Sequence, residues 1–160
     1  MEDESVKQIA CEESNPEKAL RLFKSGYNCS QSVLAVYCER LGLDMDTALK
    51  LSSSFGGGMG RLREVCGAVS AMFMIAGLKS GYTVPVNITD KGVHYELIQE
   101  LARKFKDKNG SVICRELLGL ELIHDDPMPE KRTKEYYKKR PCTEIVCSTA
   151  EIIDEVLGII

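Results

Sequence analysis

Cysteine is the residue type in this sequence that could carry chemistry, because a thiol can act as a nucleophile, a redox group or a metal ligand. The chain holds 7 cysteines among its 160 residues, and reducing compartments keep structural disulfides rare. Metal binding, catalytic thiol chemistry and simple burial are therefore all open, and only the positions of the cysteines can separate them. The four that share a local setting are Cys29, Cys66, Cys114 and Cys142.

Each of these four cysteines stands where the sequence predicts the start of a helix. Cys29 follows the capping residue Asn28, Cys66 follows a glycine-rich stretch, Cys114 follows the extended dipeptide Val112-Ile113, and Cys142 follows Pro141. At a helix N-terminus, the unpaired N–H groups and the positive end of the helix dipole favour an anion, which lowers the pKa of a thiol. We therefore predict that the four thiols converge on one pocket, where several helix ends together stabilise thiolates.

The wide spacing of the four cysteines does not distinguish thiol chemistry from metal binding. They do not form the CxxC pairs of a zinc ribbon or a thioredoxin-like motif. Two close thiols could carry out thiol–disulfide exchange, with one attacking and the other resolving the mixed disulfide. Four thiolates in one small volume could instead hold zinc or an iron–sulfur cluster, in an electron carrier or a structural module. A third hypothesis is an interaction module whose thiols are incidental.

The remaining cysteines and the two histidines fit structural roles better. Cys38 and Cys147 lie inside predicted helices among apolar neighbours, so we expect both to be buried like small hydrophobic side chains. Cys11 lies in a charged first segment, where we expect mobility. His94 could reach the thiols as a ligand or proton donor, although a single histidine near an apolar stripe is more typical of packing. His124 is expected at the surface, and the absence of a CxxCH motif excludes covalent c-type haem attachment.

The stretch SSSFGGGMGRLREVC places four glycines and two arginines in front of Cys66. A P-loop requires Gly-Lys-Ser/Thr after its glycines, whereas Gly60 is followed here by Arg61-Leu62-Arg63, so nucleotide hydrolysis is not expected. We expect the glycines to adopt positive φ and to approach neighbouring helices closely, which would bring Cys66 to a shared centre. In the alternative, turn N–H groups with Arg61 or Arg63 hold a small carboxylate or phosphate beside the thiol.

The hydrophobic periodicity predicts an all-α fold, a compact bundle of six or seven helices with a Gly-rich loop before a buried central helix. The chain is 44% hydrophobic, which is enough for a single core, and no paired period-2 strands are present. We expect a charged N-terminal segment over 1–14 and a single helical domain over 15–160. The expected helices cover 15–26, 29–42, 44–55, 66–78, 90–108, 114–119 and 142–157, with an irregular excursion over 119–141.

Charge and hydropathy exclude two kinds of partner. A net charge of -3 argues against a nucleic-acid partner, because such proteins concentrate Lys and Arg on one face. The one basic run, Lys131 to Arg140, is interrupted by glutamates, and we expect a solvated segment there. The first residues carry no secretory signal, and no stretch is apolar for long enough to span a membrane. We therefore expect a cytoplasmic protein.

Three stretches and a late cysteine together resemble a known family. They are GYNCSQSVLAVY (26–37), FGGGMGRLREVCGAVSAMFMIAGLKSG (55–81), CRELLG (114–119) and Cys142. Over about residues 16–157 the chain resembles the C_GCAxxG_C_C family, which is named for its cysteines. Two residues depart from the pattern in that name, since Val65 precedes Cys66 and Ala71 stands where the second glycine would fall.

The resemblance implies a compact helical domain that is redox-active or metal-binding, and that also occurs as a module of certain multihaem cytochromes. Carried over by position, the signature cysteines are Cys29, Cys66, Cys114 and Cys142. On this resemblance we expect these four to be the catalytic thiols of an oxidoreductase with an unidentified redox partner. The alternative is that the same four cysteines bind zinc or an iron–sulfur cluster.

Overall fold

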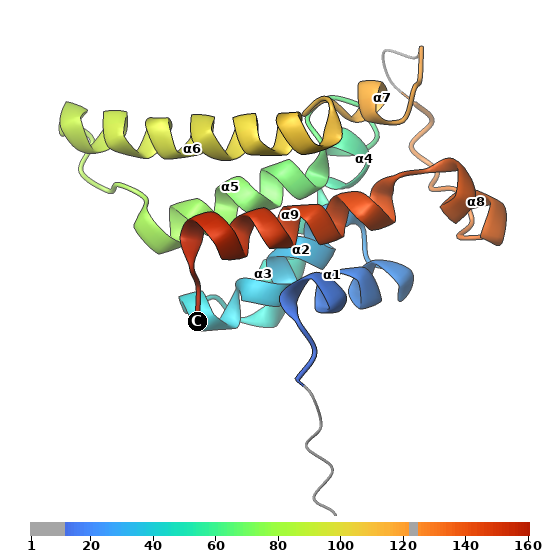
Figure 1. The fold of residues 1–160 in the computed structure, drawn as a ribbon, viewed down its shortest axis with the longest axis horizontal. Helices are drawn as coiled ribbons and strands as arrows, with labels where there is room; N and C mark the ends of the chain where they lie inside the picture. Colours follow the sequence, from blue (N-terminus) through green and yellow to red (C-terminus); the bar gives the residue numbers. More distant parts are fainter. Residues whose placement is uncertain (1–11, 122–124) are drawn as a thin grey trace, which may run out of the picture.

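The computed structural model describes residues 12–121 and 125–160, and every regular element in this part of the chain is a helix (Figure 1). The predicted all-α fold is therefore confirmed. The elements in chain order are α1 (Asn15–Lys24), α2 (Cys29–Tyr37), the 3₁₀ helix η1 (Glu39–Leu41), α3 (Met45–Ser53), α4 (Gly56–Met59), α5 (Gly67–Ser80), α6 (Ile88–Asn109), α7 (Cys114–Leu117), α8 (Lys134–Lys139) and α9 (Cys142–Leu157).

The predicted starts of the first two helices agree with the structure, whereas α6 begins at Ile88, two residues before the predicted start. Ser14 accepts a hydrogen bond from the Glu17 N–H and completes a capping box at α1, and Asn28 does the same with Gln31 at α2. The last helix begins at Cys142, as predicted. Side-chain caps satisfy N–H groups that a helix leaves unpaired, so these local signals determine where the two helices begin.

Two short helices lie where the sequence analysis expected irregular backbone. One is α4 in the glycine stretch, whose backbone is left-handed from Gly57 to Met59 and therefore not that of an ordinary α-helix, and the other is α8 inside the excursion over 119–141. The Thr133 side chain caps α8 by accepting a hydrogen bond from the Tyr136 N–H. Both Tyr136 and Tyr137 pack against the core. The sequence analysis did not predict α8, because the lysines and the nearby prolines of this segment are typical of irregular backbone. Neither the cap nor the core contacts of the two tyrosines could be recognised among them.

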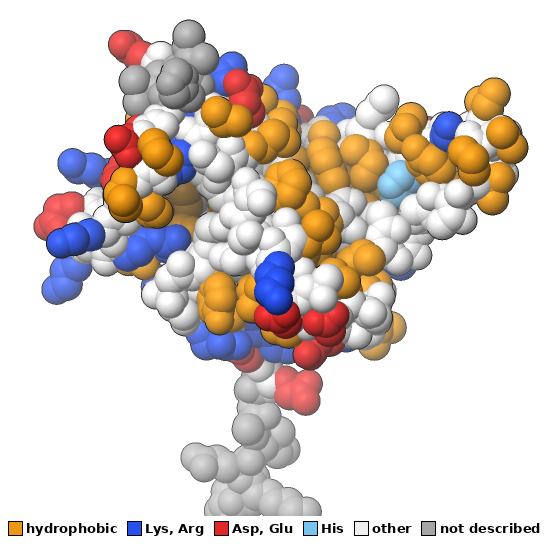
Figure 2. Space-filling view, turned by 180° about the vertical axis from the view of Figure 1, so that it is seen from behind, with side chains coloured by type: hydrophobic (Ala, Val, Ile, Leu, Met, Phe, Trp, Pro, Cys, Tyr) orange, Lys and Arg blue, Asp and Glu red, His pale blue; other side chains and the backbone are white. Residues whose placement is uncertain are grey.

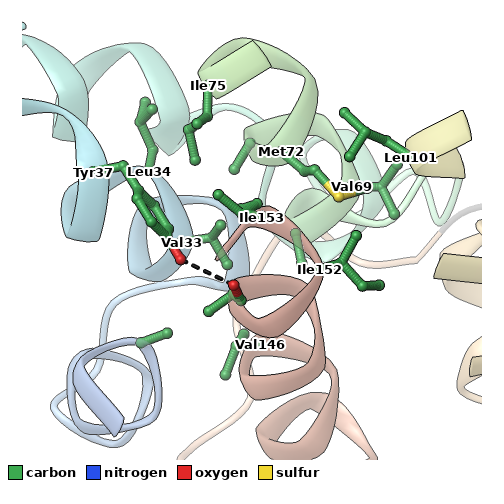
Figure 3. Close-up of a cluster of buried hydrophobic side chains, with 14 of the residues drawn as sticks. Val33, Leu34, Tyr37, Val69, Met72, Ile75, Leu101, Val146, Ile152 and Ile153 are labelled. Atoms are coloured by element: carbon green, nitrogen blue, oxygen red, sulfur yellow. Dashed lines mark hydrogen bonds between the residues drawn. The ribbon is translucent and has the colours of Figure 1, made fainter. Parts of the chain in front are cut away.

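The core lies around α5, which runs through the middle of the molecule and packs against α2, α6 and α9 (Figures 1 and 3). The helix is buried from Gly67 to Met72 and again at Ile75 and Ala76, so it is the buried central helix that the sequence predicted. Helix α1 packs along α9, on the side of α9 that faces away from α5. Figure 3 shows the main contributors to this core, which are Val33, Leu34, Tyr37, Val69, Met72, Ile75, Leu101, Val146, Ile152 and Ile153.

A buried tyrosine ties three of these helices together. The Tyr37 hydroxyl lies 3.0 Å from the Ala150 carbonyl oxygen and 2.8 Å from the Asp154 carboxylate, both on α9 (Figure 3). The Asn15 side chain of α1 donates to the same carboxylate. Burial, together with the carboxylate, raises the pKa of Tyr37. The hydroxyl therefore stays protonated and acts as a donor, as a buried polar group must to avoid a desolvation penalty.

The N-terminal part of α6 projects beyond the other helices (Figure 1). Hydrophobic side chains gather on this projecting end, as Figure 2 shows from behind. The exposed ones on α6, the end of α5 and the segment between them are Leu78, Val84, Val86, Ile88, Val93 and Tyr95. Within the described residues, no helix combines the length and the apolar composition that crossing a membrane would require.

Candidate functional site

One cavity of about 280 Å³ is lined by all four candidate cysteines. Cys29, Cys114 and Cys142 are the first residues of α2, α7 and α9, and Cys66 directly precedes α5. Each therefore lies at a helix N-terminus, as predicted. Cys66 and Cys114 are buried, whereas Cys29 and Cys142 are partly exposed. Of the four residues, Cys29 and Cys142 are therefore the two that keep more surface in contact with solvent.

The backbone that leads into Cys66 is left-handed over five consecutive residues, Gly57 to Arg61, with φ between 61° and 68°. Arg63 is left-handed too, with φ 59°. Positive φ is thereby confirmed for three of the four glycines of the stretch. A residue with a β-carbon costs roughly 1 kcal/mol or more in this conformation, so Met59 and the two arginines carry strain. Strain of this kind is concentrated at functional sites.

Close packing explains two of the glycines. A β-carbon on Gly56 would lie 2.5 Å from the side chain of Asn28, the cap of α2. A β-carbon on Gly58 would lie 2.5 Å from the β-carbon of Cys114. Because neither glycine has a side chain, the left-handed turn touches α2 and α7 at once. This contact brings Cys29 and Cys114 to the same cavity.

An isolated antiparallel bridge lies between Cys66 and Cys114 and fixes their positions relative to each other. The bridge pairs Val65 with Ile113, the residues that precede the two cysteines. The Cys66 N–H donates to the Val112 carbonyl oxygen at 2.8 Å, and the Cys114 N–H donates in return to the carbonyl oxygen of the residue before Val65 at 2.6 Å. The valine that departs from the family pattern is thus part of the pairing that sets this register.

Cys29 and Cys66 form a thiolate and thiol pair. A hydrogen bond with the Cys66 thiol is the largest influence on Cys29, and it lowers the pKa of Cys29 from an ordinary 9.0 to about 6, against the effect of burial. The N–H groups of Gly57, Ser30 and Gly67 also donate to the Cys29 sulfur and lower its pKa. In return, Cys29 and burial raise the pKa of Cys66 well above 9.0. Of the two thiols, Cys29 is therefore the one whose pKa favours ionisation.

Arg61 and Arg63, the candidate anion-binding residues, both line the cavity and share one carboxylate. Their guanidinium groups lie 3.0 Å and 2.9 Å from Asp125. Arg63 is only 2% exposed and also lies 3.5 Å from the Cys114 sulfur. Its charge opposes the rise that burial causes in the pKa of Cys114, but burial prevails. The sequence carried no signal for Asp125, because no local pattern connects it to arginines so far away in the chain.

The expectation that helix ends would stabilise several thiolates holds only at Cys29. The pKa of Cys66 is raised by its hydrogen bond with Cys29 and by burial, and that of Cys114 by burial. Burial also raises the pKa of Cys142 to about 12, with the charge of Cys29 adding to the effect. At these three positions the expectation is wrong, because desolvation and the neighbouring thiolate outweigh the helix end.

The run from Lys131 to Arg140 is not simply a solvated segment, because Arg132 and Arg140 line the cavity. The Arg132 guanidinium lies 4.2 Å from the centre of the Phe23 ring and donates to the Phe23 carbonyl oxygen. The Arg140 guanidinium lies 4.8 Å from the centre of the Tyr136 ring. The signal for this packing was the presence of two adjacent tyrosines within the basic run, since arginine readily covers aromatic faces.

The other candidates lie away from the cavity. Cys38 is fully buried in the core, as predicted, and burial raises its pKa. Cys147 is only partly buried. His94 packs edge-on against Tyr82 in a separate, smaller cavity, and its Nδ1 has no hydrogen-bond partner within the described residues. Cys11 and His124 lie outside the residues that the structure describes.

Thiolates are the soft ligands that zinc and iron–sulfur clusters take, so the donor type suits either metal centre. In 12–121 and 125–160, however, no three His, Cys, Asp or Glu side chains are grouped as the ligands of one ion would be. The arrangement of the thiols therefore does not fit a shared metal ion.

The fold and the site define an all-α protein with four cysteines on one cavity. The family model described as "Putative redox-active protein (C_GCAxxG_C_C)" matches residues 27–156, which include all four, and the chain belongs to this family. The predicted resemblance is thereby confirmed. Neither the curated proteins nor the solved structures that were compared include a match to the chain.

Proposed function

We propose that the protein is a thiol–disulfide oxidoreductase in which Cys29 is the attacking thiolate and Cys66 is the resolving thiol. The observation that carries the proposal is the contact between the Cys29 sulfur, the Cys66 thiol and three backbone N–H groups, which lowers the pKa of Cys29 to about 6. A thiol whose pKa lies near the ambient pH is an effective attacking group. The redox-active description of the family supports the same chemistry.

The reaction is a two-electron exchange between the cysteine pair and a disulfide substrate. The Cys29 thiolate attacks one sulfur of the substrate, the S–S bond breaks, and the other half leaves as a thiolate that takes a proton from solvent. Cys66 then loses its proton and attacks the Cys29 sulfur of the mixed disulfide, which releases the second half of the substrate. The substrate is reduced to two thiols, and Cys29 and Cys66 are oxidised to a disulfide.

Exposure assigns the two roles. Cys29 is partly exposed on the cavity, so a substrate sulfur can approach it, whereas Cys66 is buried. The raised pKa of Cys66 also keeps this thiol protonated until Cys29 has been consumed in the mixed disulfide. Once the Cys29 thiolate is no longer a charged neighbour, proton loss from Cys66 becomes easier. The order of attack and resolution therefore follows from the pair itself.

Cys114 and Cys142 lie on the same cavity but carry raised pKa values, so they are protonated at neutral pH. We assign them no covalent step. A dithiol reductase in a reducing compartment such as the cytoplasm would return the oxidised pair to its thiol form. Metal binding is the alternative that thiol donors would allow, although the described residues do not group three of them around one point.

The test is a reaction with the neutral probe 2-hydroxyethyl disulfide, followed by mass spectrometry of the intact protein and its peptides. The wild-type protein, purified without oxygen, is expected to form a Cys29–Cys66 disulfide. Cys66→Ser should stop at the mixed disulfide on Cys29, and Cys29→Ser should react at least about 100-fold more slowly. Cys147→Ser is the matched control, because it removes a thiol that does not line the cavity, and it should behave as wild type.

Elemental analysis of the same sample decides between the two proposals. Stoichiometric zinc or iron that is lost in Cys66→Ser, together with a wild-type protein that does not react with the probe, would replace thiol exchange with metal binding. Reaction at Cys114 or Cys142 in place of Cys29 would also contradict the assigned roles.

A further inference from the structure

Four guanidinium groups line the cavity that holds the cysteines. They belong to Arg61, Arg63, Arg132 and Arg140. The carboxylates that face them are fewer, since Asp125 serves the first two arginines and Glu130 serves the last. The wall of the cavity therefore carries an excess of positive charge, even when Cys29 is ionised.

Among these four arginines, Arg132 is the one whose charge no carboxylate of the described residues balances. Its guanidinium donates to the carbonyl oxygens of Phe23 and Tyr27, at 2.9 Å and 3.1 Å. It also lies 5.0 Å from the centre of the Tyr136 ring. Neutral carbonyls and rings hold the group in place without neutralising it, so it remains available to an anion in the cavity.

Arg63, although it pairs with Asp125, adds a second and independent sign, which is a missing hydrogen-bond acceptor. Its side chain is 2% exposed, and its Nε is buried with no hydrogen-bond partner within the described residues. A buried donor without a partner costs about 1–3 kcal/mol, and native proteins rarely leave one without a reason. The residue lies on the cavity wall beside Cys114.

We propose that the substrate is a small disulfide that carries carboxylate groups, and that Arg132 and Arg63 bind these carboxylates while Cys29 attacks the disulfide. This inference rests on the proposed thiol exchange and names its substrate class. The cavity of about 280 Å³ lies at the small end of ligand pockets, which span about 300–1,000 Å³. Arginine is the residue best suited to bind carboxylates, because its planar group donates two parallel hydrogen bonds.

A preference for anionic disulfides cannot come from the thiolate itself. A thiolate repels an anionic disulfide, so an unassisted exchange favours neutral or cationic disulfides over anionic ones. A preference for the anion therefore requires the arginines. Positive groups focused in a cavity raise the association rate of an anionic substrate by roughly 10- to 1,000-fold.

The test compares three dialkyl disulfides of similar size, 3,3′-dithiodipropionate (anionic), 2-hydroxyethyl disulfide (neutral) and cystamine (cationic). The rate of mixed-disulfide formation on Cys29 is measured in Cys66→Ser and divided by the rate of each probe with a free small-molecule thiol. We expect the anionic probe to react at least about 10-fold faster than the neutral one on this scale, with cystamine slowest. Raising the salt concentration should reduce the difference.

Arg132→Gln in the same background is expected to remove most of the preference, which is measured as the ratio of the rate with the anionic probe to the rate with the neutral probe. Lys138→Gln is the matched control, because Lys138 is exposed on α8 and does not line the cavity. It should keep the full preference. If Arg132→Gln does not fold, the ratio measured in the parent protein still decides the inference.

The outcomes separate this inference from the function on which it rests. If none of the three probes reacts with Cys29, the proposed thiol exchange fails, and the inference fails with it. If all three react but the neutral or cationic probe is fastest, thiol exchange stands and the substrate class is overturned. An anionic preference that survives in Arg132→Gln would remove Arg132 from the binding site.

Discussion

Gly67 lies directly against the Cys29 sulfur, so that a β-carbon added to Gly67 would come within 2.6 Å of it. The Gly67 N–H also donates to this sulfur. Gly67→Ala should therefore displace the thiolate, weaken its hydrogen bonds and raise the pKa of Cys29 by about one unit or more. The measurement is the pH profile of iodoacetamide alkylation at Cys29, where a one-unit rise in pKa lowers the rate at pH 6 by about 5-fold.

The matched control for this substitution lies on the same helix. A β-carbon added to Gly77 would meet no atom of the described residues within 4 Å, so Gly77→Ala should leave the pKa of Cys29 unchanged. It should also stabilise α5 by up to about 1 kcal/mol through helix propensity. An unshifted Cys29 profile in Gly67→Ala would show that the contact does not control the thiolate.

Asp125→Asn should lower the stability of the protein and raise the reactivity of the Cys114 thiol. Arg63 loses its carboxylate partner while its side chain remains 2% exposed, which should lower the free energy of unfolding by about 1–3 kcal/mol. The freed guanidinium then acts on Cys114 alone, so the pKa of that thiol should fall and its alkylation should quicken. Urea unfolding and peptide-resolved alkylation measure the two effects.

Asp107→Asn provides the comparison, because it breaks an exposed pair with Arg103 on α6. Exposed pairs contribute little, so this variant should unfold at nearly the wild-type urea concentration. Equal stability of the two variants, or an unchanged Cys114, would contradict the assigned role of Asp125.

Cys38→Ala should affect packing alone. Cys38 is fully buried in the core, and its thiol points to the Ala35 carbonyl oxygen at 3.6 Å. Removing one buried atom of this size should cost about 1 kcal/mol. Alkylation of Cys29 and the reaction with disulfides should keep their wild-type rates. A folded Cys38→Ala protein that has lost this reactivity would contradict the structural assignment.

The shifted pKa values of the thiols also predict how the free energy of unfolding depends on pH. The pKa of Cys29 is about 6 in the folded protein and near 9.0 in the unfolded chain, so its contribution is full above pH 9 and is lost as the pH falls toward 6. Above pH 9 the sign reverses, because the raised pKa values of Cys66 and Cys142 make the folded state hold protons that the unfolded chain releases. Relative to Cys29→Ser, the wild-type protein should therefore gain stability between pH 6 and 9, measured by urea unfolding under reductant.

Local signals in the sequence were sufficient to predict most of the fold. Capping residues such as Asn28 and the apolar composition after Cys66 act over one or two helical turns. Tertiary packing does not override the helices that these local features favour. The helix α8 was missed because its stability comes from contacts of Tyr136 and Tyr137 with a distant core. No local pattern reports contacts of that kind.

The candidate site could likewise be predicted only in part. The placement of its cysteines at helix N-termini could be predicted, because it depends on neighbours in the sequence. Their pKa values could not, because burial and the contact between Cys29 and Cys66 depend on segments that meet only in the folded chain. The same holds for Asp125, which pairs with Arg63, and for Arg132, which lines the cavity, because both come from the part of the chain after α7.

The left-handed turn from Gly57 to Arg61 has a consequence for proteolysis. Trypsin cleaves after arginine and binds its substrates as extended chains, which is a conformation that neither Arg61 nor Arg63 adopts here. A cut after either arginine therefore requires the turn to open and release its hold on α2 and α7. The rate of limited digestion at these two bonds would therefore measure how often the turn opens and the cysteine cavity loses this part of its wall.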